Sequence, residues 1–322
     1  MMKTLPLPLA GYGQSLSKII LGTAGFGTRI PESTSMKLMD AYAEAGGTCL
    51  DTARVYGKNA DGLPVSEQVI GTWLKTAGMR DKMTIISKGA HFDPGKPHIS
   101  RVTPSCIEED IEKSLESLRA DTVDLYFLHR DNPREAVENI MPVLHRYVKA
   151  GHIKMLGASN WSTERILKAN CFARENGMTP FCTSEIQWTL ADINPEEDVF
   201  SDLPRMTGPE YLKYRGMQIP VLAWSPQAGG IFSSILAGET DSIREKTRLK
   251  YYTPLTLKRA ENVRRVCRQY GITPTQAVLG YVLCNPLPAA AIVGPSTLEH
   301  LADSLTAADL ELPPEAVSML TE

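Results

Sequence analysis

Short apolar runs alternate with longer stretches of helical periodicity along almost the whole chain. This alternation is typical of parallel α/β proteins, because each strand needs a helix to return the chain to the same end of the sheet. Eight apolar runs are predicted strands: Ser17–Leu21, Thr48–Asp51, Met83–Ser87, Val123–Leu128, Ile153–Gly157, Thr183–Gln187, Pro220–Trp224 and Ala289–Val293. Eight such units predict a (β/α)8 TIM barrel in which residues 1–322 form a single domain.

Helix starts are marked by capping patterns between these strands. Four starts carry a cap residue followed by proline or a capping box: Thr103, Asn132, Thr273 and Ser296. The first opens an apolar stripe that runs to Arg119. Two helical stretches, residues 256–270 and 274–285, precede the last strand, so one is additional to a minimal barrel. A further short helix is expected after residue 312.

The chain outside these units predicts where the two ends of the barrel lie. Leu5 to Ser15, centred on Gly11-Tyr12-Gly13, predicts a small hairpin, which we expect to plug the bottom of the barrel. Three irregular segments follow strands: His91–Val102, Asp192–Gly208 and Gly229–Tyr252. In a barrel they crowd the C-terminal face, where active sites form.

Composition narrows the class of protein. Charged residues make up 22% of the chain and the net charge is −3, with no clustered basic footprint for nucleic acid. The six cysteines show neither Cys-x-x-Cys nor any metal-like spacing, so no metal site is predicted. No run of about 18 apolar residues suggests a membrane span or a secretion signal. We expect a cytoplasmic enzyme, and a homo-oligomer is compatible with the sequence.

A glycine-rich loop follows the first strand but does not predict a dinucleotide-binding fold. The loop, Gly22-Thr23-Ala24-Gly25-Phe26-Gly27, has Gly-x-x-Gly-x-Gly spacing, and a helical pattern stands where a second strand with an acidic end is needed. We interpret its glycines as positions where the backbone approaches a ligand.

Three ionisable side chains stand at the ends of successive strands. Asp51 ends the second strand, Lys88 the third and His129 the fourth. Strand ends converge on one face of a barrel, so these groups are predicted to lie close together. An apolar interior excludes such groups unless they are paired or used. The remaining ends carry polar, flat or small residues: Ser159, Asn160, Gln187, Trp224 and Gly294.

The motifs at these ends resemble the aldo-keto reductase family. They are Leu50-Asp51-Thr52-Ala53-Arg54-Val55-Tyr56-Gly57, Ile86-Ser87-Lys88, Asp124-Leu125-Tyr126-Phe127-Leu128-His129, Gly157-Ala158-Ser159-Asn160-Trp161, Glu185-Ile186-Gln187-Trp188, Ala223-Trp224-Ser225-Pro226 and Ile292-Val293-Gly294-Pro295-Ser296. The resemblance runs from about Lys18 to about Leu310. Each motif alone is weak, whereas all of them in order at consecutive strand ends form a specific signal.

The resemblance implies reduction of a carbonyl to an alcohol, reversibly, with four catalytic residues. Tyr56 is expected to donate the proton, and Lys88 to lower the pKa of its phenol, which is near 10 in water. Asp51 is expected to pair with Lys88, and His129 to orient the carbonyl oxygen. Each residue also has a structural interpretation: a buried ion pair, an interior histidine or a loop aromatic. Their coincidence at neighbouring strand ends favours catalysis.

A nicotinamide cofactor follows from the same resemblance. Its expected contacts are Gly22, Thr23, Ser159, Asn160, Gln187, Trp224, Ser225, Gln227, Gly294, Ser296, His300, Asp303 and Ser304. Trp224 would stack on the nicotinamide ring, and the helix that opens at Ser296 would hold an adenosine phosphate. The family points to NADPH. No fixed cation stands at the ribose 2′-phosphate, so NADH remains an alternative unless His300 or a cation from 244–250 supplies the charge.

The substrate side of the site is less specified. Phe26, Arg54, Arg130 and Trp188 are the candidate contacts, and two arginines among aromatics suit a polar, sugar-like carbonyl compound. Two other interpretations stay open. One is a non-catalytic barrel that binds a nicotinamide nucleotide as a sensor or accessory subunit. The other is a barrel enzyme in which Lys88 forms a Schiff base, which requires a neutral lysine.

Overall fold

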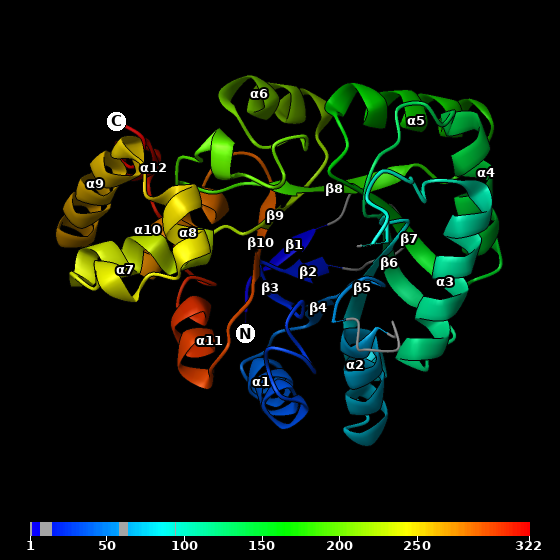
Figure 1. Cartoon of the computed structure of the whole chain (residues 1–322), viewed down its shortest axis with the longest axis horizontal. Coiled ribbons are helices and arrows are strands. Elements are labelled where there is room, and N and C mark those ends of the chain that lie inside the picture. Colours follow the sequence, from blue (N-terminus) through cyan, green and yellow to red (C-terminus); the bar gives the residue numbers. More distant parts are fainter. Residues whose placement is uncertain (1, 7–14, 58–63, 94) are drawn as a thin grey trace.

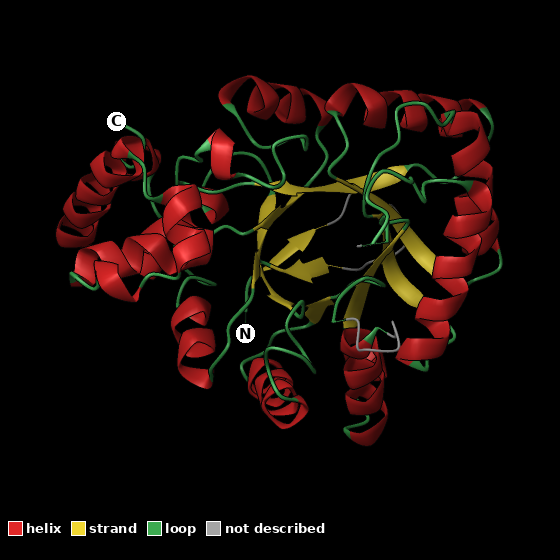
Figure 2. Ribbon diagram, viewed as in Figure 1, coloured by secondary structure: helices red, strands yellow, loops and turns green. Residues whose placement is uncertain are grey.

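Eight parallel strands form a closed barrel in the computed structural model, which describes residues 2–6, 15–57, 64–93 and 95–322 (Figure 1, Figure 2). The order around the barrel is β10-β3-β4-β5-β6-β7-β8-β9. The strands are β3 (Ile19–Gly22), β4 (Cys49–Asp51), β5 (Thr84–Gly89), β6 (Val123–Leu128), β7 (Ile153–Ser159), β8 (Phe181–Gln187), β9 (Val221–Trp224) and β10 (Ala289–Val293). The predicted TIM barrel is confirmed, and each predicted strand overlaps an observed one.

Helices surround this barrel on the outside (Figure 2). They are α1 (Glu32–Glu44), α2 (Val65–Thr76), α3 (Pro104–Leu118), α4 (Val137–Lys149), α5 (Thr163–Glu175), α6 (Gly208–Met217), α7 (Ile231–Ala237), α8 (Glu245–Tyr251), α9 (Pro254–Tyr270), α10 (Pro274–Leu283), α11 (Leu298–Leu305) and α12 (Pro314–Met319). Both predicted helical stretches before the last strand are present as α9 and α10, so the additional helix is confirmed. The short helix predicted after residue 312 is α12. None of the helices within the described ranges is long and apolar enough to cross a membrane.

Three local predictions need correction. Asn132 does not cap a helix: its side chain and carbonyl accept from the amides of Arg134 and Glu135 in a separate turn, and α4 begins at Val137. The cap of α11 is Thr297 rather than Ser296, because the Thr297 hydroxyl accepts from the His300 amide. The third segment predicted to be irregular contains α7 and α8. The caps at Thr103 and Thr273 are confirmed.

An N-terminal hairpin closes the barrel from below. Strands β1 (Thr4–Pro6) and β2 (Ser15–Ser17) pair in antiparallel fashion. Leu5 and Leu16 are buried in one cluster with inward-facing strand residues, so the plug is confirmed. Burial of a leucine side chain contributes about 1.5–3 kcal/mol. The predicted centre of the hairpin, Gly11-Tyr12-Gly13, lies outside the described residues.

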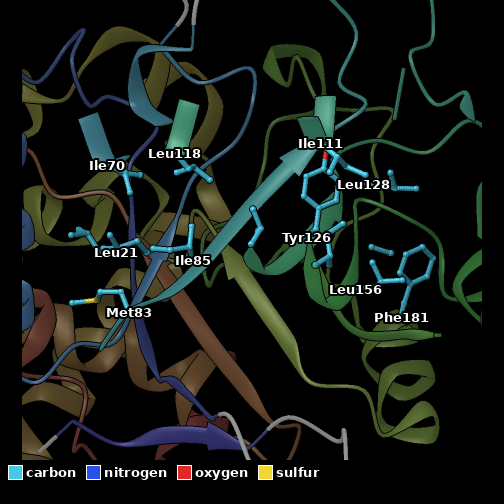
Figure 3. Close-up of a cluster of buried hydrophobic side chains, with 14 of the residues drawn as sticks. Leu21, Ile70, Met83, Ile85, Ile111, Leu118, Tyr126, Leu128, Leu156 and Phe181 are labelled. Atoms are coloured by element: carbon cyan, nitrogen blue, oxygen red, sulfur yellow. The ribbon is translucent and has the colours of Figure 1, made fainter. Parts of the chain in front are cut away.

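Side chains alternate between the two faces of every strand, and this alternation decides which residues reach the site. In β6, Leu125 and Phe127 pack inside the barrel, whereas Tyr126 and Leu128 pack outside against the helices. Figure 3 shows part of the outer layer, where Tyr126 and Leu128 lie close to Ile111 of α3.

Candidate active site

Alternation within three neighbouring strands directs the predicted catalytic residues inward. Lys88 lies two residues after the inward-facing Ile86 of β5, so it also faces inward. Asp51 and His129 likewise lie two residues after inward-facing residues of β4 and β6. Tyr56 follows β4 in the loop whose start is held by two bonds to β5: the Thr52 amide donates to the Ile86 carbonyl and the Arg54 amide to the Lys88 carbonyl.

Lys88 is the centre of the site. Its ammonium, fully buried, lies 2.5 Å from Asp51 Oδ1, 3.1 Å from the Thr52 carbonyl and 3.4 Å from the Tyr56 hydroxyl. The structure therefore brings a carboxyl, an ammonium and a phenol together as predicted. Burial opposes the charge of Lys88, but Asp51, Glu185 and Tyr56 together hold the pKa of the ammonium above its usual range.

A fourth group, His129, faces the same space from β6. Its ring lies 5.6 Å from that of Tyr56 and 4.8 Å from that of His91, edge-on in both cases. Burial holds the pKa of His129 well below its usual value, and His91, Lys88 and Arg130 add to this effect. The imidazole is therefore neutral at pH 7 and carries one N–H donor. Its Nδ1 has no hydrogen-bond partner in the part of the chain that the structure describes.

The pKa of Tyr56 differs from the sequence-based expectation. Burial raises the pKa of the phenol above its usual range, while the Lys88 ammonium lowers it by less. Lys88 therefore acts in the predicted sense, but burial outweighs it and the net pKa of Tyr56 is raised. Burial also raises the pKa of Asp51 against the attraction of Lys88. Sequence reasoning considered the ammonium and left out the cost of burying a phenolate.

Glu185 is a charged group that sequence reasoning missed. This β8 carboxyl lies 3.4 Å from Lys88 Nζ, on a side chain that is 3% exposed. The motif around it predicts a role for Gln187 and none for Glu185. The alternation of side chains along a strand could have predicted its position, because Glu185 and Gln187 are two residues apart and face the same side of the strand.

The predicted contacts for the nicotinamide amide form a hydrogen-bonded chain beside this centre. The Trp224 indole N–H donates to Asn160 Oδ1 at 3.0 Å, and Asn160 Nδ2 donates to the His129 carbonyl at 3.2 Å and to Ser159 Oγ at 2.9 Å. Phe200 lies edge-on to Trp224, with ring centroids 5.7 Å apart.

Two other predicted contacts make bonds that tie elements of the barrel together. Gln187 Nε2 donates to the Tyr251 hydroxyl of α8 at 3.0 Å. Thr23 is buried and its hydroxyl donates to the Asp51 carbonyl at 2.9 Å. Next to it, a Cβ on Gly22 would lie 2.8 Å from the Ile292 side chain. Packing inside the barrel thus accounts for this glycine without a ligand.

The predicted phosphate contacts gather where the loop after β9 meets α11. Gln227 Nε2 donates to Ser304 Oγ at 3.5 Å, and Ser304 Oγ donates to the His300 carbonyl at 2.9 Å. Ser296 Oγ lies 3.4 Å from His300 Nδ1. Asp303 accepts instead from the Thr275 hydroxyl of α10 at 2.5 Å. Two further members complete the set: Ser225, which has a φ of 52°, and the exposed Gly294.

Of the predicted substrate contacts, Arg130 lies at the mouth. Its guanidinium carbon is 5.1 Å from the Phe92 ring centroid and 5.5 Å from that of Phe200, and its charge acts on Tyr56. The Asp202 charge acts on its guanidinium, and its Nε is buried without a hydrogen-bond partner among the described residues. Burial lowers the pKa of Arg130.

The other three lie outside the mouth. Phe26 is fully buried in the outer hydrophobic layer. Trp188 directly follows Gln187 and faces the opposite side, where it packs edge-on against Tyr211. Arg54 has two buried nitrogen atoms, and its charge acts on Glu67 behind the barrel wall. Among the described residues, no cluster of His, Cys, Asp and Glu suits a metal ion.

Comparison with known proteins agrees with this geometry. Residues 18–322 match the sequence model of the Aldo/keto reductase family. The chain is 28% identical to an uncharacterized oxidoreductase, YrpG, of Bacillus subtilis (strain 168), over 98% of this chain and 94% of that protein. It is 27% identical to the aryl-alcohol dehydrogenase [NADP(+)] of Phanerodontia chrysosporium, over 97% and 83%. It is also 26% identical to a norsolorinic acid reductase of Emericella nidulans, over 96% and 78%.

Proposed function

Because the chain belongs to the aldo/keto reductase family, we propose that it is an NAD(P)H-dependent oxidoreductase that reduces an aldehyde or ketone to an alcohol, reversibly. The observation that carries this proposal is the contact of Lys88 with both Asp51 and Tyr56, opposite a neutral His129. A protein that only binds the nucleotide has no need of a proton donor beside a buried ammonium.

The mechanism follows from the charges around Tyr56. When bound, a reduced nicotinamide would supply hydride for the carbonyl carbon, and the carbonyl oxygen would need a proton from the protein. Tyr56 donates it, and the neutral His129 donates a hydrogen bond that orients the oxygen. Burial alone makes the phenol a weak acid, so the Lys88 ammonium is needed to stabilise the phenolate that remains. Asp51 holds Lys88 charged, which disfavours the Schiff-base alternative.

The residues around Trp224 fit a nicotinamide cofactor. Trp224 offers a half-buried flat face at the mouth, and Ser159 and Asn160 offer polar groups beside it. The exposed hydroxyls near the start of α11 suit a phosphate. We keep NADPH as the proposed cofactor, since one relative is named for NADP(+). Lys250 is paired with the buried Asp198, so His300 or the cations at 244, 246 and 248 remain to meet a 2′-phosphate.

An aromatic carbonyl compound fits the mouth better than a sugar. The sugar-like expectation depended on two arginines, and Arg54 faces the outer layer. Of the two arginines only Arg130 remains at the mouth, where it lies between the rings of Phe92 and Phe200. Such a lining suits a flat substrate that bears an acceptor group. The names of two relatives, an aryl-alcohol dehydrogenase and a norsolorinic acid reductase, point the same way.

A turnover panel tests the proposal directly. NADPH and NADH are titrated separately, and each is then supplied with aryl aldehydes, aryl ketones and aldoses while the absorbance of the reduced nicotinamide is followed. We expect turnover with NADPH and aryl carbonyls. Tight NADPH binding without turnover of any carbonyl would favour the sensor or accessory role. Borohydride trapping of a substrate on Lys88 would favour the Schiff-base enzyme.

A further inference from the structure

The Lys88 ammonium serves two carboxyl groups at once. Asp51 Oδ1 lies 2.5 Å from Nζ on the β4 side, and Glu185 Oε2 lies 3.4 Å away on the β8 side. Glu185 stands opposite Ser159 in the register of β7 and β8, so its side chain enters the barrel level with the predicted cofactor contacts. Its Oε2 accepts no hydrogen bond from any described residue.

This arrangement leaves a charge imbalance in a buried site. The groups that face Glu185 are Lys88 from β5, Asp51 from β4, the Ser159 hydroxyl from β7 and Tyr56 from the loop after β4, and one cation cannot neutralise both carboxylates. Burial raises the pKa of Glu185 to about 8, with Asp51 adding to the effect and Lys88 opposing it. The carboxyl is therefore mostly protonated at pH 7 and ionises in mild alkali.

We infer that Glu185 is a positioning residue of the proposed reaction: its carboxyl shares the Lys88 ammonium with Asp51, and its charge decides how strongly that ammonium acts on the Tyr56 hydroxyl. The inference rests on the proposed function for its consequence in catalysis. The shared ammonium can be tested without turnover.

The sign of the effect follows from the charges. A neutral Glu185 leaves Lys88 free to stabilise the Tyr56 phenolate, so proton donation is easier. An ionised Glu185 draws on the ammonium and repels the phenolate, so the phenol becomes a weaker acid. Carbonyl reduction is therefore expected to slow as the pH rises through the ionisation of Glu185.

The pH profile of Glu185→Gln tests this. With an aryl aldehyde that the wild-type enzyme reduces, we expect the wild-type kcat to fall about tenfold as the pH passes about 8. Glu185→Gln should lose this alkaline limb, whatever its kcat at pH 7. The matched control is Glu67→Gln, which removes another buried carboxyl that does not contact Lys88. Its limb should match that of the wild type. An unchanged limb in Glu185→Gln, or loss of the limb in Glu67→Gln, overturns the inference.

An infrared titration separates failure of this inference from failure of the proposed function. The carbonyl band of a protonated buried carboxyl, assigned by its absence from Glu185→Gln, should be present at pH 6 and disappear through about pH 8. Lys88→Met should keep this band to higher pH, because the ammonium that favours the charged form is gone. If the band disappears through about pH 8 and persists to higher pH in Lys88→Met, but no carbonyl is reduced, then the shared ammonium is supported and the proposed reaction is wrong. If the band is absent at pH 6, or unmoved in Lys88→Met, the inference is wrong.

Discussion

Two buried polar clusters lie on opposite faces of β5, and they contain similar groups. On the inner face, Lys88 meets two carboxyls and Tyr56. On the outer face, Ser87 donates to Glu67 at 2.6 Å, and the charges of Glu67 and Arg54 act on Tyr126. Each cluster thus combines a carboxyl, a cation and a tyrosine. The β5 residues that take part in them, Ser87 outside and Lys88 inside, are adjacent in sequence.

The clusters differ in access. The inner phenol is half-buried at the mouth of the barrel, next to His129, whereas Tyr126 is fully buried beneath α3 (Figure 3). The outer cluster also contains side-chain atoms without partners among the described residues, including the Tyr126 hydroxyl and the Ser114 hydroxyl. Residue types with perturbed pKa values therefore do not define an active site by themselves, and the face of the strand decides between the two.

The largest expected difference between the clusters is in the tyrosines. Tyr56→Phe should lower kcat by about 10²–10⁴-fold, because it removes the proton donor, and should leave cofactor binding almost intact. Tyr126→Phe should leave kcat unchanged and should not destabilise the protein, since it removes a buried hydroxyl that has no hydrogen-bond partner among the residues the structure describes. Steady-state kinetics and thermal unfolding measure both. Wild-type turnover in Tyr56→Phe would end the proposed mechanism.

A second pair of variants compares a tryptophan of the outer layer, Trp188, with one at the mouth of the barrel, Trp224. Trp188→Ala should cost about 3–5 kcal/mol of stability, because Trp188 fills the outer layer, and should leave cofactor affinity unchanged. Trp224→Ala should weaken cofactor affinity about tenfold with a smaller loss of stability. Calorimetric titration and denaturant unfolding provide the two values. Wild-type affinity in Trp224→Ala would contradict the stacking role.

The smallest expected effect concerns pH and the outer carboxyl. Burial raises the pKa of Glu67 to about 7 from an ordinary 4.5, so the folded protein holds this proton more tightly than the unfolded chain. Its contribution is full below pH 4.5 and is lost as the pH rises to about 7. Relative to Glu67→Gln, the wild-type free energy of unfolding should therefore drop by roughly 2–3 kcal/mol over this range. Parallel pH profiles of the two proteins would refute the assignment.

The sequence predicted most of the barrel because its signals are local. An apolar run followed by a helical stripe recurs eight times, and motifs at strand ends locate Asp51, Lys88 and His129. Boundaries failed where a cap residue could serve a turn instead of a helix, as at Asn132. The two short helices after β9 carry too few turns to show a period.

The site was harder to predict because side-chain direction in loops depends on contacts far away in the chain. Arg54 and Arg130 look alike in sequence, yet one faces the outer layer and the other the mouth. For strand residues the direction was available from alternation, which separates Glu185 from Trp188. The net pKa of Tyr56 required the extent of burial, which no motif gives.

The bond from the Trp224 indole to Asn160 has a consequence for how this pocket can be re-engineered. A tyrosine or phenylalanine at position 224 lacks that N–H, so Asn160 would lose one partner while still tied to the backbone of His129. Positions 160 and 224 thus form one epistatic unit, whose substitutions do not combine additively. A library intended to alter nicotinamide preference has to vary both positions together, because single exchanges report on a broken pair rather than on the cofactor.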